Sequence, residues 1–254
     1  MATYTVATPK GGVGKSTTAA ELVLALSQHG RRVLAVDLDQ QGNLTNRLGL
    51  TASSEVDGTT ADVLAGELDL DQAATPSPVL GGVDVLADTE ANPPADLTTF
   101  LRDELPAHAD RWDDVVIDTP PSVGALTQAG LAAADVIIAP VTPSVEAYDQ
   151  LRRLAAVLDA RIAKRVNRGA QISWVVPVAF DSRAAQGRGR LLDREILTQL
   201  RNTYPGRVTP PVRDSVTARD AYLESLPVGA YAPDTPVAND YATAAHVIIQ
   251  GATS

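Results

Sequence analysis

The sequence predicts an α/β fold in which a mainly parallel β-sheet carries helices on both faces. Short apolar runs with the length of buried strands alternate along the chain with segments of helical periodicity. Several of these runs end on a glycine-rich turn or an aspartate, as strands do at the ligand-binding edge of a parallel sheet. Aromatic residues make up only 4% of the 254 residues, which suits helix-on-sheet packing better than a β-sandwich.

The N-terminal part of the chain contains the clearest elements. Tyr4–Ala7 is expected to form a strand that leads into a glycine-rich turn. A helix from about Ser16 to His29 follows, and Gly30 ends it in a left-handed cap position. The apolar run Arg32–Asp37 is a second buried strand, followed by a turn and a short helix between residues 40 and 50. This order is that of a βαβ unit.

The pattern between residues 51 and 118 is weaker but continues the alternation. We expect a helix at 60–64, an acidic stretch at 67–71, a strand at 83–87, a helix at 96–105 and a strand at 114–118.

The remainder of the chain repeats strand and helix to the end. We expect strands at 135–141, 172–180 and 208–212, and helices at 126–134, 144–165, 190–204, 214–223 and 237–250. Pro177 cannot donate a ladder hydrogen bond, so its strand is expected at the sheet edge or ends near Val176. No linker or repeat divides the chain, and we expect one domain over residues 1–254.

The turn at residues 8–18, TPKGGVGKSTT, has the composition of a phosphate-binding loop. Its three glycines permit a tight turn that aims several backbone N–H groups at one point, where a helix N-terminus adds its positive dipole end. Lys15 can then reach the outer phosphates of a nucleoside triphosphate, and the Ser16 hydroxyl can bind the accompanying Mg²⁺. The alternative is a glycine-rich turn without function. A doubled glycine, a Gly-Lys-Ser tripeptide and a position between a strand and a helix rarely coincide by chance, so we favour the phosphate-binding loop.

Aspartates at two strand ends complete a candidate catalytic centre. Asp118 closes the strand VVID in the position of a carboxylate that holds Mg²⁺ through water. Asp39 lies just beyond the second strand, where it can orient or polarise a water that attacks the γ-phosphate. The alternative for each, and for Asp37, is an ordinary solvated acidic residue at a strand end.

Charge is distributed unevenly along the chain, whose formal net charge is −10. The first 150 residues carry 7 basic and 22 acidic residues, whereas residues 152–219 carry 14 basic and 5 acidic ones. Thirteen of those 14 are arginine, the better residue for phosphate recognition. This span could form a face for nucleic acid, or it could be an ordinary solvated surface.

Composition excludes several other classes of protein. The absence of cysteine rules out disulfides and cysteine-held metal clusters on this chain. The first residues resemble no leader peptide and no apolar run reaches membrane-span length, so we expect a cytoplasmic protein without a membrane partner. The loop begins too early for a preceding helix-turn-helix, which argues against a sequence-specific DNA reader.

Taken together, the motifs resemble those of ParA/MinD-family ATPases, and of small ParA-type partition proteins in particular. PKGGVGKST resembles the family's deviant Walker A motif, with Pro9 in place of a glycine and a second lysine, Lys10. VDLDQQGNLT resembles its Walker A′ motif and VVIDTPPSVG its Walker B and switch segment, in which Gly124 lies. The likeness covers nearly the whole chain and implies a P-loop NTPase fold of the SIMIBI type.

The resemblance also implies roles for individual residues. Lys10 would cross the interface of an ATP-sandwich dimer to the partner's phosphates, and Asp39 would be the catalytic aspartate next to the magnesium site formed by Ser16 and Asp118. The implied catalytic residues are Lys10, Lys15 and Asp39, and the implied nucleotide contacts are Lys10, Gly11, Gly12, Val13, Gly14, Lys15, Ser16, Thr17, Pro211 and Arg213. The family's usual I-P-R-N is replaced here by residues 212–215, VRDS.

For function, the resemblance implies ATP- and Mg²⁺-dependent dimerisation, non-specific DNA binding and slow hydrolysis stimulated by a ParB-like centromere-binding protein, at the nucleoid. The DNA-binding candidates are Arg183, Arg188, Arg190 and Arg213. A P-loop metabolic enzyme, such as an amide-forming synthetase, and a MinD-like positioning ATPase without DNA binding are the alternatives. The last fits less well, because residues 237–254 contain no lysine or arginine for a membrane-binding helix.

Overall fold

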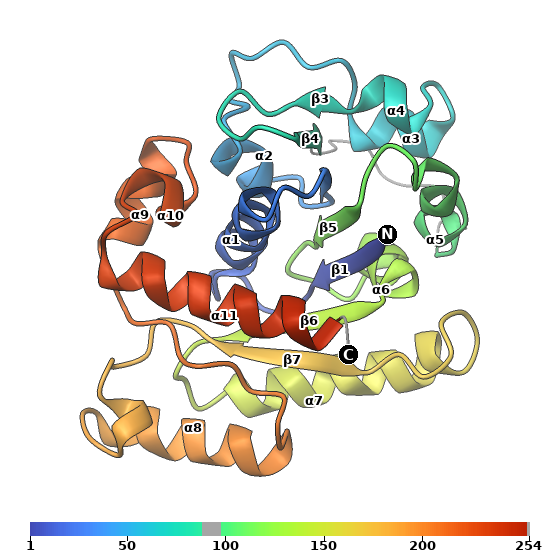
Figure 1. The fold of residues 1–254 in the computed structure, drawn as a ribbon. Helices are drawn as coiled ribbons and strands as arrows, with labels where there is room; N and C mark the ends of the chain where they lie inside the picture. Colours follow the sequence, from blue (N-terminus) through green and yellow to red (C-terminus); the bar gives the residue numbers. More distant parts are fainter. Residues whose placement is uncertain (88–97, 253–254) are drawn as a thin grey trace.

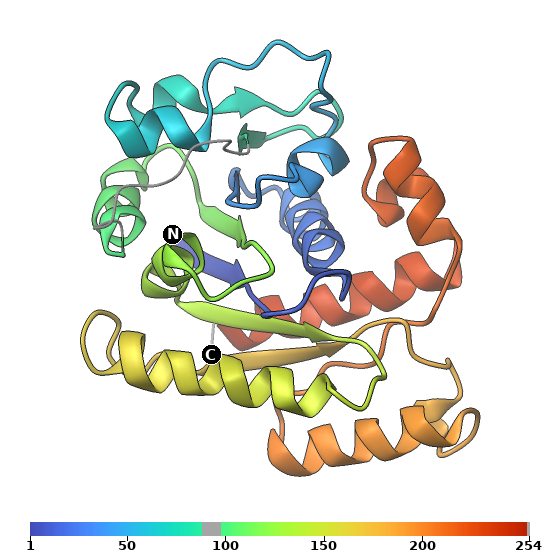
Figure 2. The same cartoon turned by 180° about the vertical axis from the view of Figure 1, so that it is seen from behind.

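The computed structural model describes residues 1–87 and 98–252, which form a seven-stranded sheet packed between helices (Figures 1 and 2). The strand order is β3-β4-β2-β5-β1-β6-β7. The strands are β1 (Ala2–Val6), β2 (Val33–Asp37), β3 (Thr75–Pro76), β4 (Val83–Leu86), β5 (Asp114–Asp118), β6 (Val136–Val141) and β7 (Ile172–Pro177). All neighbouring strands run parallel except β3, which pairs antiparallel with β4. The predicted mainly parallel sheet is therefore confirmed.

Helices cover both faces of this sheet, as the near-continuous apolar strands require. Along β5, Val116 packs in one cluster with α1 (Lys15–Gln28), while Val115 and Ile117 pack on the opposite face with α6 (Ala125–Ala133). The first face also carries α2 (Asn43–Arg47), α9 (Thr217–Leu223), α10 (Val228–Tyr231) and α11 (Pro236–Ala252). The opposite face carries α3 (Thr60–Ala65), α4 (Leu70–Ala73), α5 (Phe100–Glu104), α6, α7 (Ala147–Val157) and α8 (Leu191–Thr203).

Short 3₁₀ and π turns extend or connect several of these helices. They are η1 (Leu105–His108), the π-helical η2 (Leu158–Ala163) and η3 (Ala184–Gln186). The long helix predicted at 144–165 is therefore α7 followed by η2, and the one predicted at 96–105 is α5, with residues 96 and 97 outside the described residues. Gly30 ends α1 with a φ of 74°, as expected for a left-handed cap.

The strand predicted at 208–212 does not form. This segment runs beside β7 and makes isolated backbone pairs with it, such as the 2.8 Å hydrogen bond from the Val212 N–H to the Pro177 carbonyl. Pro210 and Pro211 have no N–H group, so they interrupt any continuous ladder. The prediction for Pro177 is confirmed on both counts, since β7 is the edge strand and ends at this residue.

The sheet brings the sequence motifs to one edge. Val6 pairs with Asp118, and Asp37 also pairs with Asp118 from the other side. The glycine loop after β1, the turn after β2 and the end of β5 therefore meet at the carboxyl edge, where parallel sheets bind ligands. Within residues 1–87 and 98–252, every helix is too short or too polar to cross a lipid bilayer.

Candidate nucleotide-binding site

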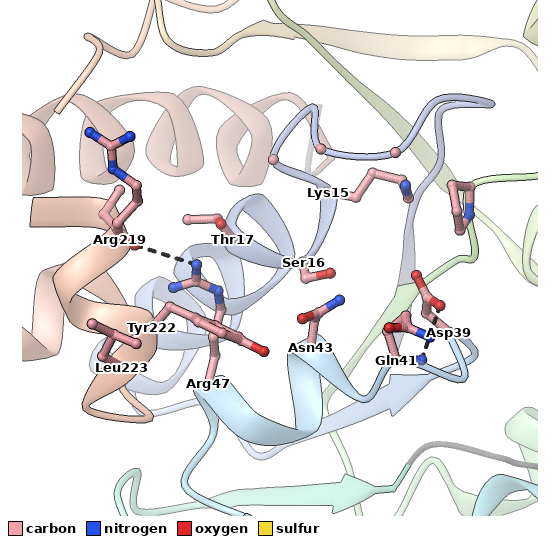
Figure 3. Close-up of a pocket in the computed structure, with 15 residues that line it drawn as sticks. Lys15, Ser16, Thr17, Asp39, Gln41, Asn43, Arg47, Arg219, Tyr222 and Leu223 are labelled. Atoms are coloured by element: carbon pink, nitrogen blue, oxygen red, sulfur yellow. Dashed lines mark hydrogen bonds between the residues drawn. The ribbon is translucent and has the colours of Figure 1, made fainter. Parts of the chain in front are cut away.

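A cavity of about 690 Å³ opens at this edge of the sheet. Four segments line it: the glycine loop with the first turn of α1, the residues after β2 through α2, Pro121 after β5, and helix α9. Figure 3 shows Lys15 and Asp39 toward one end of the cavity and Arg47, Tyr222 and Arg219 toward the other. The lining residues are Gly11, Gly12, Gly14, Lys15, Ser16, Thr17, Asp39, Gln41, Asn43, Arg47, Pro121, Ala218, Arg219, Tyr222 and Leu223.

The loop backbone takes the shape that its glycines permit. Gly12 and Gly14 have φ angles of 71° and 87°, in the left-handed region that other residues rarely adopt. A Cβ atom on Gly14 would lie 3.1 Å from Cγ1 of Val178, so a side chain at this position would also force that neighbour to shift. Gly14 is also the residue from which α1 begins. The N–H groups of the first helical turn are thus free to face an anion in the cavity.

Lys15 holds a buried ammonium group at the bottom of the loop. The residue is 6% exposed, and its Nζ donates a 3.2 Å hydrogen bond to the carbonyl of Lys10. Burial lowers the pKa of Lys15 below its usual value, while the carboxylates of Asp118 and Asp39 act in the opposite direction. The ammonium is therefore held in place near two acidic groups, ready to contact phosphate oxygens.

Asp118 is a fully buried carboxyl group. Among the described residues, neither of its oxygens has a hydrogen-bond partner. Burial raises its pKa well above the usual range, the nearby Asp37 raises it further, and the Ser16 hydroxyl lowers it. An orphaned buried carboxylate beside a hydroxyl and a lysine is costly alone, but it suits a hard divalent cation such as Mg²⁺.

The structure separates the roles of the two aspartates after β2. Asp37 is completely buried, and it accepts hydrogen bonds of 2.9–3.1 Å from the backbone N–H groups of Asp39, Leu44 and Thr45 and from the Thr45 hydroxyl. It therefore fixes the turn and the start of α2. Asp39 lines the cavity, and its Oδ1 accepts a 3.2 Å bond from the Gln41 N–H, which orients the carboxylate.

Several predicted nucleotide contacts lie outside this cavity. Val13 is 1% exposed and packs in the interior, and Pro211 does not line the cavity. Arg213 forms a bidentate ion pair with Asp240, with distances of 2.5 and 2.9 Å. The Lys10 side chain is 43% exposed, and its Nζ lies 3.7 Å from Glu146 Oε2. Lys10 is thus accessible to another molecule rather than committed to the cavity of its own chain.

The other arginines predicted to bind DNA lie on the loop between β7 and α8. Arg183 pairs with Asp181 at 3.0 Å, and Arg190 pairs with the buried Asp193 at 3.0 Å. Arg188 is exposed, and no ion pair engages it in the described part of the chain. The loop therefore presents three exposed guanidinium groups, two of which keep their positions through carboxylates of the same region.

Five polar or aromatic residues of the cavity were not predicted as site residues from the sequence: Gln41, Asn43, Arg47, Arg219 and Tyr222. Asn43 is four residues beyond Asp39, so the motif around Asp39 could have suggested it. Arg47, Arg219 and Tyr222 carry no local signal, because α2 and α9 meet only in the folded chain.

Comparison with known proteins identifies the kind of site. Residues 1–172 match the model of an AAA-domain family. The chain is 32% identical over 245 residues to the chromosome-partitioning ATPase Soj of Thermus thermophilus, which covers 93% of this chain and 90% of that protein. Its fold is similar to that of apo McdA from Cyanothece, with a TM-score of 0.85 and 21% identity over 98% of this chain and 99% of that one.

It also resembles cobyrinic acid a,c-diamide synthase from Mycobacterium smegmatis, solved with ADP and magnesium, with a TM-score of 0.78 and 25% identity over 100% of this chain and 96% of the other. The phosphate-binding loop, the buried Asp118 and the cavity that contains Asp39 agree with these likenesses. The chain belongs to the ParA/MinD family of P-loop ATPases.

Proposed function

We propose that the protein is a DNA-segregation or positioning ATPase whose Mg²⁺-ATP binding controls its own dimerisation. The observation that carries the proposal is that Lys15 and Asp39 line one cavity and the buried Asp118 lies near Lys15, in a chain 32% identical to Soj over nearly its whole length. Residues 1–254 would act as one ATPase domain, in the cytoplasm at the nucleoid.

In this proposal the loop binds the phosphates of ATP. The backbone N–H groups of Gly11–Thr17 and the start of α1 would surround the β- and γ-phosphates, with Lys15 neutralising their charge. Ser16 would hold Mg²⁺ directly and Asp118 would hold it through water. The metal would supply charge stabilisation for the phosphoryl group as it leaves. Bringing a cation to Asp118 would also relieve the cost of its burial.

Asp39 is proposed to act in hydrolysis rather than in binding. It is next to the phosphate site, it is 7% exposed, and the Gln41 N–H orients its carboxylate. From there it would orient or polarise the water that attacks the γ-phosphate in line with the leaving group.

Lys10 is proposed to contact the phosphates bound by a second copy of the chain. Its ammonium is accessible, and its pairing with Glu146 is an exposed contact that contributes little energy to the fold. Exchange of Glu146 for a phosphate would therefore cost little, and ATP bound between two copies would draw them together.

The loop from residue 181 to 190 is proposed to bind DNA in the dimer. Its arginines Arg183, Arg188 and Arg190 are exposed on a chain segment of net positive charge. Two copies would double the number of phosphate contacts, which gives a sequence-independent and salt-sensitive affinity. Arg213 is a weaker candidate, because Asp240 already pairs with it. A ParB-like centromere-binding protein would stimulate hydrolysis and release the DNA.

Retention of the protein on random duplex DNA at low salt tests this function. With Mg²⁺-ATP we expect retention that Arg188→Ala weakens, that higher salt abolishes and that ADP does not support. Arg111→Ala is the matched control, since Arg111 belongs to a distant contact with Trp112. Absence of ATP-dependent retention would contradict the DNA-binding role.

A metabolic enzyme is the second candidate, and the likeness to the diamide synthase favours it. An amide-forming enzyme would need a site for an acid substrate beside the γ-phosphate. It would hydrolyse or transfer phosphate faster when a carboxylic acid and an amine donor are supplied, without any effect of DNA. Stimulation by DNA and a centromere-binding protein, rather than by small substrates, distinguishes the two.

A further inference from the structure

Arg47 is a charged side chain buried between the nucleotide cavity and helix α9. It is 7% exposed and lines the cavity at the end opposite Lys15 and Asp39. Among the described residues no carboxylate forms an ion pair with it, and its Nη1 has no hydrogen-bond partner. A buried guanidinium group with so few polar partners is expensive to maintain, so the contacts that it does make are informative.

Within residues 1–87 and 98–252, the side-chain hydrogen bond and the aromatic contact of Arg47 are both with α9. Its Nη2 donates a 3.4 Å hydrogen bond to the carbonyl of Ala218, and the guanidinium carbon lies 5.0 Å from the centroid of the Tyr222 ring. Figure 3 shows this side chain extending from α2 across to α9. Only arginine combines a planar cation that stacks on an aromatic face with N–H groups that donate at its edge.

Helix α9 depends on such contacts for its position. Both ends of this helix are open to solvent: Val216, which precedes it, is 61% exposed and Leu223, its last residue, is 78% exposed. A turn through Ser225, whose φ is 57°, joins α9 to α10, and the N–H groups of Val228 and Gly229 bind the buried Glu21 carboxylate of α1. Besides the core packing of Ala221 and Val228, two polar side chains from the helices beside the phosphate site, Arg47 and Glu21, therefore hold this helix pair.

We propose that Arg47 is a positioning residue for ATP binding, which holds α9 against α2 and so fixes the far wall of the nucleotide cavity. The inference rests on the proposed function, because it takes ATP as the ligand of this cavity. Among the described residues, no hydrogen bond or ion pair joins Arg47 to Lys15, Asp39 or Asp118, so loosening α9 weakens ATP binding and leaves the hydrolytic step unchanged.

Steady-state ATPase kinetics on four single variants and one double variant test the proposal. Arg47→Met and Tyr222→Ala remove the contact from either side, and each is expected to raise KM for ATP about three- to tenfold with kcat within about twofold of wild type. Tyr222→Phe keeps the ring and should stay within about twofold of the wild-type KM. Arg47→Lys keeps the charge but loses the planar group that stacks on the ring, so it should raise KM about as much as Arg47→Met does. The Arg47→Met/Tyr222→Ala double variant should have a KM for ATP no higher than that of either single variant, because each single substitution removes the same shared contact.

An unchanged KM in a folded Arg47→Met protein would overturn the proposal. A wild-type KM in Arg47→Lys would also overturn it, because a positive charge without the planar stack would then be enough. Additive KM increases in the double variant would overturn it as well, since Arg47 would then act without α9. If Arg47→Met does not fold, the exposed Tyr222→Ala carries the same test, and its unchanged KM overturns the inference. Lys15→Ala distinguishes failure of the proposed function from failure of the Arg47 inference. Retained ATP binding in that variant contradicts the proposed function itself, whatever the results for the Arg47 variants.

Discussion

Single side chains at the carboxyl edge of the sheet divide the work of the site. Lys15 and Ser16 line the cavity, Asp118 is a buried acceptor without a hydrogen-bond partner among the described residues, and Asp39 is fixed by the turn that Asp37 organises. Each could be assigned from sequence because each lies in a short motif whose spacing reflects a local turn. The chemistry of the site is thus mostly local.

Lys15→Ala is expected to lose ATP binding, because the buried ammonium is the cation closest to the phosphate positions of the loop. Isothermal titration calorimetry with Mg²⁺-ATP measures this affinity. Arg31→Ala, on the opposite side of α1 and paired with Asp114, is the matched loss of a cation and should bind as wild type. Tight binding of ATP by Lys15→Ala would show that the phosphates do not bind at this loop.

Asp39→Ala is expected to bind ATP with near-normal affinity and to hydrolyse it about 10²–10⁴-fold more slowly, the usual effect of losing a general base. Single-turnover hydrolysis with the enzyme in excess measures the rate. Turnover close to wild type would assign the catalytic carboxylate elsewhere.

The buried Glu21 makes the free energy of unfolding fall as the pH rises. Burial raises its pKa to about 7, although hydrogen bonds from Gly229 and Val228 oppose the shift. The folded protein therefore binds a proton more tightly than the unfolded chain, and this contribution to stability is lost as pH rises from about 4.5 through 7. Relative to Glu21→Gln, the wild type should lose roughly 3 kcal/mol at most between pH 5 and 8 in urea unfolding. A difference independent of pH would contradict this assignment.

At the scale of elements, the two ends of α1 show what glycine does in each place. Gly14 and Gly30 both have positive φ angles, 87° and 74°. A Cβ at Gly14 would also meet Val178 at 3.1 Å, whereas one at Gly30 would meet nothing within 4 Å. Gly14→Ala and Gly30→Ala should therefore share a strain of about 1–2 kcal/mol in thermal unfolding.

Only Gly14→Ala should also weaken ATP binding, because its strain displaces the loop at the start of α1. Titration of both variants with Mg²⁺-ATP compares them directly. Equal affinities in the two variants would show that the loop tolerates the added atom, against this account.

Elements were predicted from sequence where apolar periodicity was continuous, as in β2, β5 and α1. The failures have physical causes. Residues 208–212 have strand composition but two prolines, so they pair with β7 only at isolated points. The wall formed by Arg47 and Tyr222 arises from the meeting of α2 and α9, which are about 170 residues apart, and no local pattern encodes it.

At the scale of the whole molecule, the sheet order determines which motifs share a site. Residues that follow β1, β2 and β5 meet because these strands are neighbours, and α9 closes the cavity from the far end of the chain. The basic loop at 181–190 lies after β7, at the opposite edge of the sheet from β4. ATP and DNA would therefore occupy separate surfaces, and dimerisation would be the link between them.

ATP bound at this loop is proposed to join two copies of the chain through Lys10. Light scattering with Mg²⁺-ATP measures this dimerisation most directly as a molar mass, in the Asp39→Ala variant that is expected to hydrolyse ATP slowly. With Mg²⁺-ATP we expect a dimer of twice the 26.6 kDa chain mass, and with ADP a monomer. The double variant Asp39→Ala/Lys10→Ala should bind ATP but remain a monomer. A mass that stays at one chain with ATP bound, or at two chains whatever the nucleotide, would contradict the account.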